Sequence, residues 1–329
     1  MRRAALVALA AAAGFVGVVP PATAGQTATW GPTVVTDVPP TPADTHVKPT
    51  QKVVQMAVVT SPVMEAGQIA YIYSTITASD ADQPNLIDNE VRCAGAGTEN
   101  VVMGENVIQP PGAPANRTIT IITRFLITAT THGTISCTQY LRTSSTSLHV
   151  ARETVSGVIR FASPSVGGDV SGAQMQESLP HGNPVVRTSV TTPVLDRDLP
   201  PGYTKLAIIA DVEYHRCAVA QDCVKGYSTA RFALTATTSG APGCDSAPVA
   251  QSQETVRTGV NHAAVPLYTI VAVKPGCNHV HAQVTTTHVG DDVGLVGGAA
   301  VGLTDSTGQA GDTPNHTSAM THVFVVPSS

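Results

Sequence analysis

The residues best suited to chemistry lie close together in the stretch CNHVHAQVTTTHVGDD, which runs from Cys277 to Asp292. Its three histidines are His279, His281 and His288. Imidazole nitrogens are common ligands of zinc, copper and iron. Side chains two residues apart on a strand share a face and stand about 6.6 Å apart, which suits two ligands of one ion. A metal site centred on His279 and His281 is therefore one hypothesis.

A third ligand would have to join this pair, and His288 is the local candidate. Alternation along a strand turns His288 to the opposite face, and only a bulge or strand end after Thr286 would bring it round. The H-x-H pair also resembles the metal motif of the cupins, which implies a bound metal ion. A cupin has a glutamate a few residues on, where this chain has Val284, Thr285 and Thr286. We therefore favour a polar strand face, with no resident cofactor, over a metal site.

A second group of oxygen donors lies in SDADQPNLIDNE, between Ser79 and Glu90. Carboxylate and amide oxygens are the ligands that Ca²⁺ prefers. The stretch is not an EF-hand loop, because Pro84 stands at a ligand position and the turn glycine is absent. We expect an acidic turn between strands, with Ca²⁺ as the alternative. The potential ligands are Asp80, Asp82, Asn85, Asp88 and Glu90.

A third group, Asp211, Glu213 and His215, shares one face of the expected strand 205–215. Two carboxylates with a histidine could perform acid–base chemistry. Simple alternation produces the same stripe on any strand that faces solvent, and we expect that arrangement here. The chain has neither a G-x-S-x-G nor an H-E-x-x-H motif. We therefore assign no catalytic residue and predict that the protein is not an enzyme.

The cysteines predict disulfide bonds. An even number of cysteines in an exported chain is typical of disulfides, and no C-x-x-C pair supports zinc binding. The loop between the third and fourth cysteines is expected to be a hairpin tip closed by a disulfide; the alternative is a rigid recognition loop, as in an inhibitor of extracellular proteases. The economical pairing is Cys93–Cys137, Cys217–Cys223 and Cys244–Cys277.

The first residues indicate export. A short basic start precedes an apolar run over residues 4–19, and Ala22 and Ala24 form the small-x-small pattern of a cleavage site. We predict a cleaved signal peptide over 1–24 and a secreted, extracellular protein. No later stretch is long and apolar enough for an integral membrane segment.

The charge of the mature chain narrows the partners. Removing Arg2 and Arg3 from the 18 basic residues leaves 16 against 23 acidic ones, a net charge of −7. This balance argues against a nucleic-acid partner. A surface rich in hydroxyl groups suits contact with other molecules, so we expect an extracellular protein or a component of the cell surface or cell wall.

The apolar residues recur mostly with a period of two, which predicts strands and no sustained helix. The fold class is therefore all-β, with two antiparallel β-sandwich domains of immunoglobulin-like or jelly-roll-like type. Cys93 and Cys137 lie on core-facing sides, which predicts a buried bridge between two packed sheets and resembles an immunoglobulin-like sandwich without its packed tryptophan. The clearest strands are expected at 118–129, 134–142, 205–215, 230–238, 265–273, 279–287 and 322–326.

Proline, glycine and serine mark the breaks between the domains. The expected organisation is a signal peptide at 1–24, a Pro/Thr-rich extended arm at 25–48, a sandwich at 49–162, a Gly/Ser/Pro linker at 163–184 and a second sandwich at 185–329. With no catalytic motif and few carboxylates, we predict a secreted, non-catalytic structural or binding protein at or outside the cell surface. The alternatives are a metal-dependent enzyme centred on His279 and His281, and a protease inhibitor that uses the loop 217–223.

Overall fold

The all-β prediction is confirmed by the computed structural model, which has strands and no helix in the residues that it describes. No helix that could cross a membrane therefore occurs in this part of the chain. The predicted signal peptide lies outside it. The described residues are 27–36, 52–79, 84–106, 118–145, 152–162, 175–179, 184–199, 202–216, 224–257, 262–297, 299–300, 318–319 and 321–327.

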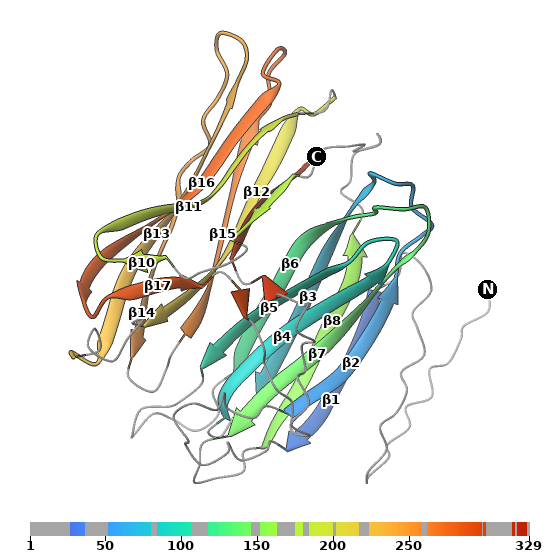
Figure 1. Ribbon diagram of the computed structural model, residues 1–329, viewed down its shortest axis with the longest axis vertical. Helices are drawn as coiled ribbons and strands as arrows, with labels where there is room; N and C mark the ends of the chain where they lie inside the picture. Colours follow the sequence, from blue (N-terminus) through green and yellow to red (C-terminus); the bar gives the residue numbers. More distant parts are fainter. Residues whose placement is uncertain are drawn as a thin grey trace.

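The first β-sandwich occupies the lower right of Figure 1. Its two sheets have the strand orders β1-β8-β3-β6 and β18-β19-β5-β4-β7-β2. Ile72 and Phe125 of one sheet pack against Val91 and Val101 of the other in its core. The strands are β1 (Thr27–Thr36), β2 (Lys52–Thr60), β3 (Ile69–Ser79), β4 (Pro84–Gly95), β5 (Glu99–Asn106), β6 (Ile119–Thr128), β7 (Ile135–Ser145), β8 (Arg152–Ala162), β18 (Ala299–Ala300) and β19 (Ser318–Ala319).

The second β-sandwich lies at the upper left of Figure 1. Its inner sheet has the order β10-β17-β12-β20-β9 with β15 paired to β12, and its outer sheet has the order β11-β16-β13-β14. Their shared core belongs to one continuous apolar cluster, which also includes Ile69 and Leu126 of the first sandwich. The strands are β9 (Gln176–Ser178), β10 (Val185–Val186), β11 (Ser189–Asp198), β12 (Lys205–Arg216), β13 (Tyr227–Ser239), β14 (Ala250–Arg257), β15 (His262–Ala272), β16 (His279–Asp291), β17 (Gly294–Gly297) and β20 (His322–Pro327).

The first disulfide joins Cys93 and Cys137, as the pairing predicted, but its place in the fold differs from the prediction. The two cysteines lie directly opposite each other on neighbouring strands of one sheet, with a Cα–Cα distance of 4.0 Å. Both face the core, which is all that alternation along a strand can show. The bridge therefore reinforces a single sheet, and the expected link between two packed sheets is wrong.

The expected extended arm at 25–48 is corrected over residues 27–36, which form the edge strand β1 paired with β8. The reason is Trp30, whose ring packs against the first core while its Nε1 donates a hydrogen bond to Gln139 Oε1 at 2.7 Å. One large aromatic side chain supplies enough buried surface to hold the strand in place. Residues 37–48 lie outside the described part of the chain.

The expected linker at 163–184 also contains sheet structure. Its strand β9 pairs with β20, and Met175 is only 3% exposed in the second core. The side-chain oxygen of Gln176 accepts a hydrogen bond from the backbone N–H of Leu126, at 2.7 Å. Residues 175–179 therefore belong to the contact between the sandwiches, although glycine and proline on both sides make them resemble a linker.

The central strand of the second sandwich, β12, is buried on both faces. Leu206, Ile208 and Tyr214 face the core of the sandwich. The opposite face carries Asp211 and Glu213, which are 1% and 0% exposed because the first sandwich covers them. The expectation that this acidic stripe faces solvent is therefore wrong. Alternation identifies the two faces of a strand, but it cannot show that a second domain lies against one of them.

Polar contacts hold the two sandwiches together along their boundary, here called the seam, where Asp211 and Glu213 of β12 face the first sandwich. Arg124 of β6 forms a bidentate ion pair with Asp211, with Nε 2.9 Å from Oδ2 and Nη2 2.9 Å from Oδ1. His322 Nε2 lies 2.6 Å from the carbonyl oxygen of Arg124 and 3.4 Å from Asp211 Oδ2. Although burial opposes it, Arg124 together with His322 holds the pKa of Asp211 below its usual range. The seam therefore contains a buried carboxylate that stays charged.

The substitution Arg124→Ala should destabilise the protein by about 3–5 kcal/mol, because it leaves Asp211 charged and buried without its guanidinium. Urea-induced unfolding followed by circular dichroism measures this loss. The matched control is Arg197→Ala, whose ion pair with Glu177 is about 40% exposed on both sides and should contribute at most about 1 kcal/mol. Equal losses for the two variants would contradict the structural role of the buried pair.

Candidate functional site

The predicted histidine pair lies on the outer sheet of the second sandwich. Along β16 the side chains of Val280 and Ala282 are fully buried, while those of His279 and His281 face outward and are partly exposed. This confirms the strand parity expected from the sequence. The neighbouring edge strand β11 runs antiparallel, and its register places Asp198 opposite His279 and Asp196 opposite His281.

The four side chains form a hydrogen-bonded chain, here called the His–Asp cluster (Asp196, Asp198, His279 and His281). His279 Nδ1 lies 2.9 Å from Asp198 Oδ1, and His279 Nε2 contacts Asp196 Oδ1. His281 Nδ1 lies 2.8 Å from the other oxygen of Asp196. The two aspartates were not identified from the sequence. Their only signal was the D-x-D alternation at the end of a strand, whose partner strand was unknown.

The His–Asp cluster favours a positive charge on His279. Both of its ring nitrogens face carboxylate oxygens, which accept hydrogen bonds, so each nitrogen must carry a proton to donate. The hydrogen bond to Asp198 is the largest cause that raises the pKa of His279 above its usual value. The hydrogen bonds from His281 and His279 lower the pKa of Asp196. The cluster is therefore an ion-pair network on the protein surface.

The ring nitrogens of the cluster, which could ligate a metal ion, are engaged in hydrogen bonds. Three of the four ring nitrogens face aspartate oxygens, and His281 Nε2 lies 3.2 Å from the amide oxygen of Gln283. In the described residues no three His, Cys, Asp or Glu side chains surround a common point for an ion. His288 does not join the pair, because it lies seven residues further along β16, roughly 23 Å away. A bulge occurs beside His288, but its Nε2 lies 3.1 Å from the carbonyl oxygen of Asp292.

The acidic turn considered for Ca²⁺ is a strand over its described part. Residues 84–95 form β4, in which Asp88 and Glu90 are 4% and 0% exposed. Glu90 accepts hydrogen bonds from Arg92 and Arg142, and these two cations lower its pKa although burial opposes the shift. Glu90 is therefore held in a buried ion pair. Asp80, Asp82 and the side chain of Asn85 lie outside what the structure describes.

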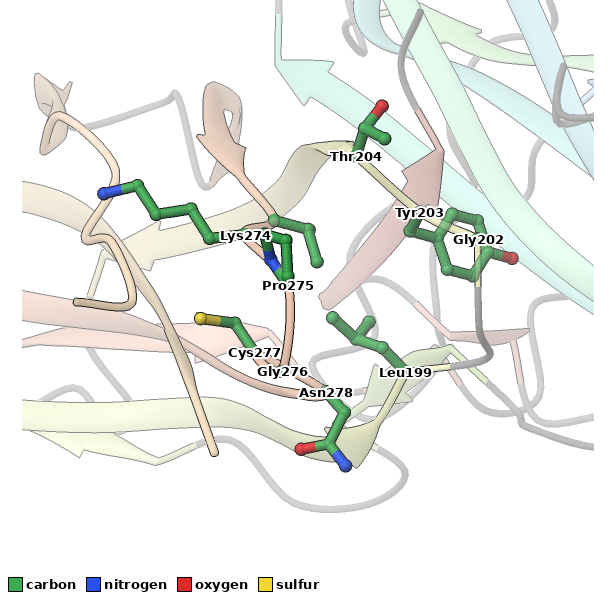
Figure 2. Close-up of a pocket in the computed structure, with 10 residues that line it drawn as sticks. Leu199, Gly202, Tyr203, Thr204, Lys274, Pro275, Gly276, Cys277 and Asn278 are labelled. Carbon is green, nitrogen blue, oxygen red and sulfur yellow. The ribbon is translucent and has the colours of Figure 1, made fainter. Parts of the chain in front are cut away.

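An open pocket of about 490 Å³ adjoins the His–Asp cluster. Asp198 of the cluster precedes Leu199 of the pocket, and Asn278 of the pocket precedes His279. Figure 2 shows the ring of Tyr203 and the side chain of Leu199 on one side, while Lys274 extends away from them. The lining residues are Leu199, Gly202, Tyr203, Thr204, Val273, Lys274, Pro275, Gly276, Cys277 and Asn278.

Backbone hydrogen bonds join the two segments that form the pocket. The N–H of Leu199 donates to the carbonyl of Asn278 at 2.7 Å, and the N–H of Val273 donates to the carbonyl of Thr204 at 2.8 Å. Gly240 has φ of +119°, and a Cβ atom there would approach the backbone oxygen of Gly276 to 2.6 Å, so the adjacent turn requires glycine at this position. The walls of the pocket are therefore fixed by main-chain contacts.

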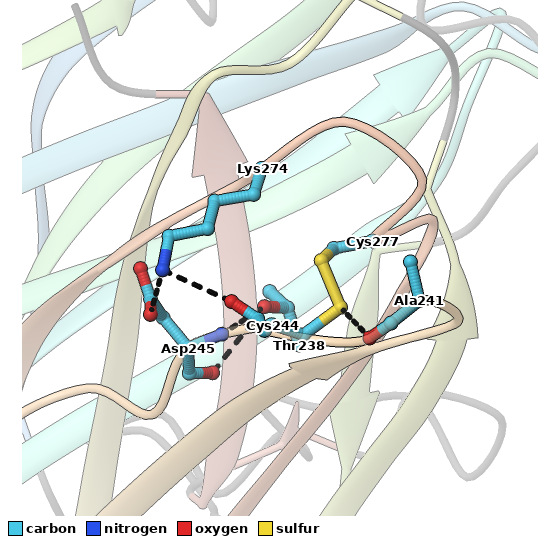
Figure 3. Close-up of a disulfide and its surroundings, with 7 residues drawn as sticks. Thr238, Ala241, Cys244, Asp245, Lys274 and Cys277 are labelled. Atoms are coloured by element: carbon cyan, nitrogen blue, oxygen red, sulfur yellow. Dashed lines mark hydrogen bonds and ion pairs between the residues drawn. A yellow bond between two sulfur atoms is a disulfide. The ribbon is translucent and has the colours of Figure 1, made fainter.

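The disulfide Cys244–Cys277 fastens the same loop to the turn after β13, as Figure 3 shows. Its Cα–Cα distance is 5.7 Å, and Cys277 is 1% exposed. Lys274 Nζ donates to Asp245 Oδ1 at 2.7 Å and to the carbonyl of Gly243 at 2.9 Å. The predicted pairing of Cys277 with Cys244 is confirmed. Cys217 and Cys223, with the recognition loop 217–223, lie outside the described residues.

Comparison with known proteins does not assign the chain to a family. No protein-family model and no curated protein matches the chain. One solved structure, described as the crystal structure of the stem and receptor binding domain of the spike protein P1 from bacteriophage PM2, is 10% identical in sequence and has a TM-score of 0.18. The alignment covers 73% of this chain and 96% of that one. A likeness of this size supports no conclusion about function.

The charge on His279 can be measured by NMR titration of its imidazole. We expect its pKa to lie above the ordinary value, and Asp198→Asn to lower it, because that change removes the largest interaction that favours the charged ring. Since the pKa of the folded state is raised, the stabilisation from His279 is present below its unfolded pKa and disappears as pH rises through the folded value. The control is Asp245→Asn, outside the cluster. A pKa of His279 unchanged by Asp198→Asn would contradict the network.

The double substitution Cys244→Ser with Cys277→Ser should lower the stability of the protein by about 2–4 kcal/mol, the usual effect of removing a native disulfide. Because the bridge fastens the loop 273–278, hydrogen exchange should increase first in this loop. Mass spectrometry of deuterium uptake measures both effects by segment. Equal increases in the loop and in the distant strand β8 would show that the bridge acts on the whole fold and not on the pocket.

Proposed function

We propose that this protein is a secreted, non-catalytic binding protein that acts at or outside the cell surface and holds its partner in the pocket beside the His–Asp cluster. The two disulfides support an oxidising compartment, because such bonds persist mainly in exported proteins. The negative net charge favours a partner other than nucleic acid. The expected partner is an extracellular protein or a component of the cell surface or cell wall.

The observation that carries this proposal is a pocket whose walls are fixed before any ligand arrives. Its volume of about 490 Å³ falls within the range of about 300–1,000 Å³ typical of ligand pockets. The disulfide and the backbone hydrogen bonds at Leu199 and Val273 restrain both loops. A restrained site loses less conformational entropy on binding, which raises affinity without additional contacts.

The lining residues favour an uncharged, partly apolar group of the partner. Leu199, Tyr203, Val273 and Pro275 provide apolar surface, and Tyr203 adds a hydroxyl group whose pKa is raised by burial of the ring. Lys274, the cation among the described lining residues, already donates to Asp245 and Gly243. An aliphatic or proline side chain of an extracellular protein fits this chemistry better than an anion does.

Binding can be tested with the labelled full chain, cells of the producing organism, their isolated envelopes and their secreted proteins. We expect retention on at least one fraction, and Tyr203→Ala should weaken it by about tenfold or more, since a buried aromatic anchor typically contributes over 1 kcal/mol. The control is Tyr227→Ala, because Tyr227 is 43% exposed at the opposite end of the outer sheet. Retention on no fraction, or equal effects of the two variants, would count against the pocket.

A further inference from the structure

The seam between the two sandwiches contains a second acidic residue, Glu213, whose surroundings differ from those of Asp211. Glu213 lies on the same face of β12, is 0% exposed, and its Oε2 accepts a hydrogen bond from the backbone N–H of Gly104 in β5, at 3.4 Å. This contact crosses from one sandwich to the other. The carboxyl group therefore lies in the boundary that would have to open if the sandwiches separated.

We propose that the seam is a pH-responsive contact, which is tight while Glu213 is protonated and loosens when the carboxyl group ionises. A charged carboxylate buried in the boundary is costly, and opening the boundary restores its hydration. The seam has a fixed part and a variable part. The bidentate pair Arg124–Asp211 stays charged, while Glu213 is the group that changes. This device does not depend on the pocket or on what the pocket binds.

Several charged or titratable groups lie on the described elements around Glu213, and His215 is the one that acts on its pKa most strongly. Its own strand carries Asp211 and His215, β20 carries His322, and the first sandwich contributes Arg124 from β6. Burial raises the pKa of Glu99 of β5, and the neighbouring His322 opposes this shift. Gly297 of β17 and Ala264 of β15 pair with Glu213 in the sheet, and Gly104 of β5 donates to its carboxylate; these three described residues carry no charge.

Close packing limits how Glu213 can escape while the seam is closed. A Cβ atom at Gly297 would lie 3.0 Å from Glu213 Cγ and 2.5 Å from His215 Nε2, so these side chains fill the space beside β17. The backbone N–H of Glu213 donates to Thr321 Oγ1 at 3.0 Å, which holds the strand in place. Hydration of an ionised Glu213 therefore requires movement of the seam and not only of its side chain.

The electrostatics of Glu213 also indicate that the closed seam becomes less stable as pH rises. Burial raises the pKa of Glu213 to about 7, and the nearby His215 and the N–H of Gly104 offset only part of this effect. Because the folded pKa is raised above the unfolded value of 4.5, the closed seam is most stable at low pH and is weakened as pH rises through about 7. If opening restores the ordinary pKa, the equilibrium constant for opening should increase ~30-fold between about pH 5.5 and about pH 8.5.

Hydrogen exchange of the full chain, corrected for the intrinsic effect of pH, measures this opening in β5 and β12. We expect the ~30-fold increase in the wild type, and nearly no pH dependence in Glu213→Gln, which keeps the shape and removes the ionisation. The matched control is Glu254→Gln on β14, outside the seam, which should behave as the wild type does. His215→Gln and His322→Gln separate the contributions of the two histidines.

A wild-type seam whose opening does not change with pH would overturn the proposal, and so would a Glu213→Gln variant that keeps the wild-type increase. If that variant fails to fold, carbon NMR of the Glu213 carboxyl group in the wild type tests the same proposal. The proposal is supported if the Glu213 carboxyl group ionises near pH 7 and hydrogen exchange at the seam increases over the same pH range. Ionisation in the ordinary range of a glutamate, or ionisation without seam exchange, contradicts it. Pocket variants leave all of these readouts unchanged.

Discussion

The buried ion pair between Arg124 and Asp211 is the constraint on which the arrangement of the two sandwiches depends. Each partner is costly to bury alone, so the pair keeps the sandwiches in one relative position. Arg124 belongs to β6, which is an edge strand of its sheet. Gln176 and His322 contact the backbone of Leu126 and Arg124, so the second sandwich covers an edge that would otherwise favour aggregation.

This arrangement decides which surface of the second sandwich is available for recognition. The inner sheet has one face in its own core and the other against the first sandwich, so the outer sheet and the loops at its end remain in contact with solvent. The pocket and the His–Asp cluster occupy that end. A fixed seam on one side and restrained loops on the other give the site a rigid support, which favours precise positioning of a partner.

Alternation in the sequence predicts the strands and their faces well, because a period of two follows directly from strand geometry. The outward His279 and the inward Val280 illustrate this success. What alternation cannot predict is the neighbour of each face. Asp196 reaches His279 through strand pairing across 83 residues, and Glu213 is buried by a separate sandwich, so neither contact has a local signal.

The sheet that contains Cys93 is completed by a strand from far along the chain. Ala319 of β19 pairs in parallel with Val101 of β5, although more than 200 positions separate them. During synthesis or export, the first sandwich therefore emerges long before its last strand. Until residues 318–319 pair with β5, one edge of that sheet remains unpaired. An unpaired edge can pair with other chains, so the risk of aggregation is greatest during this interval.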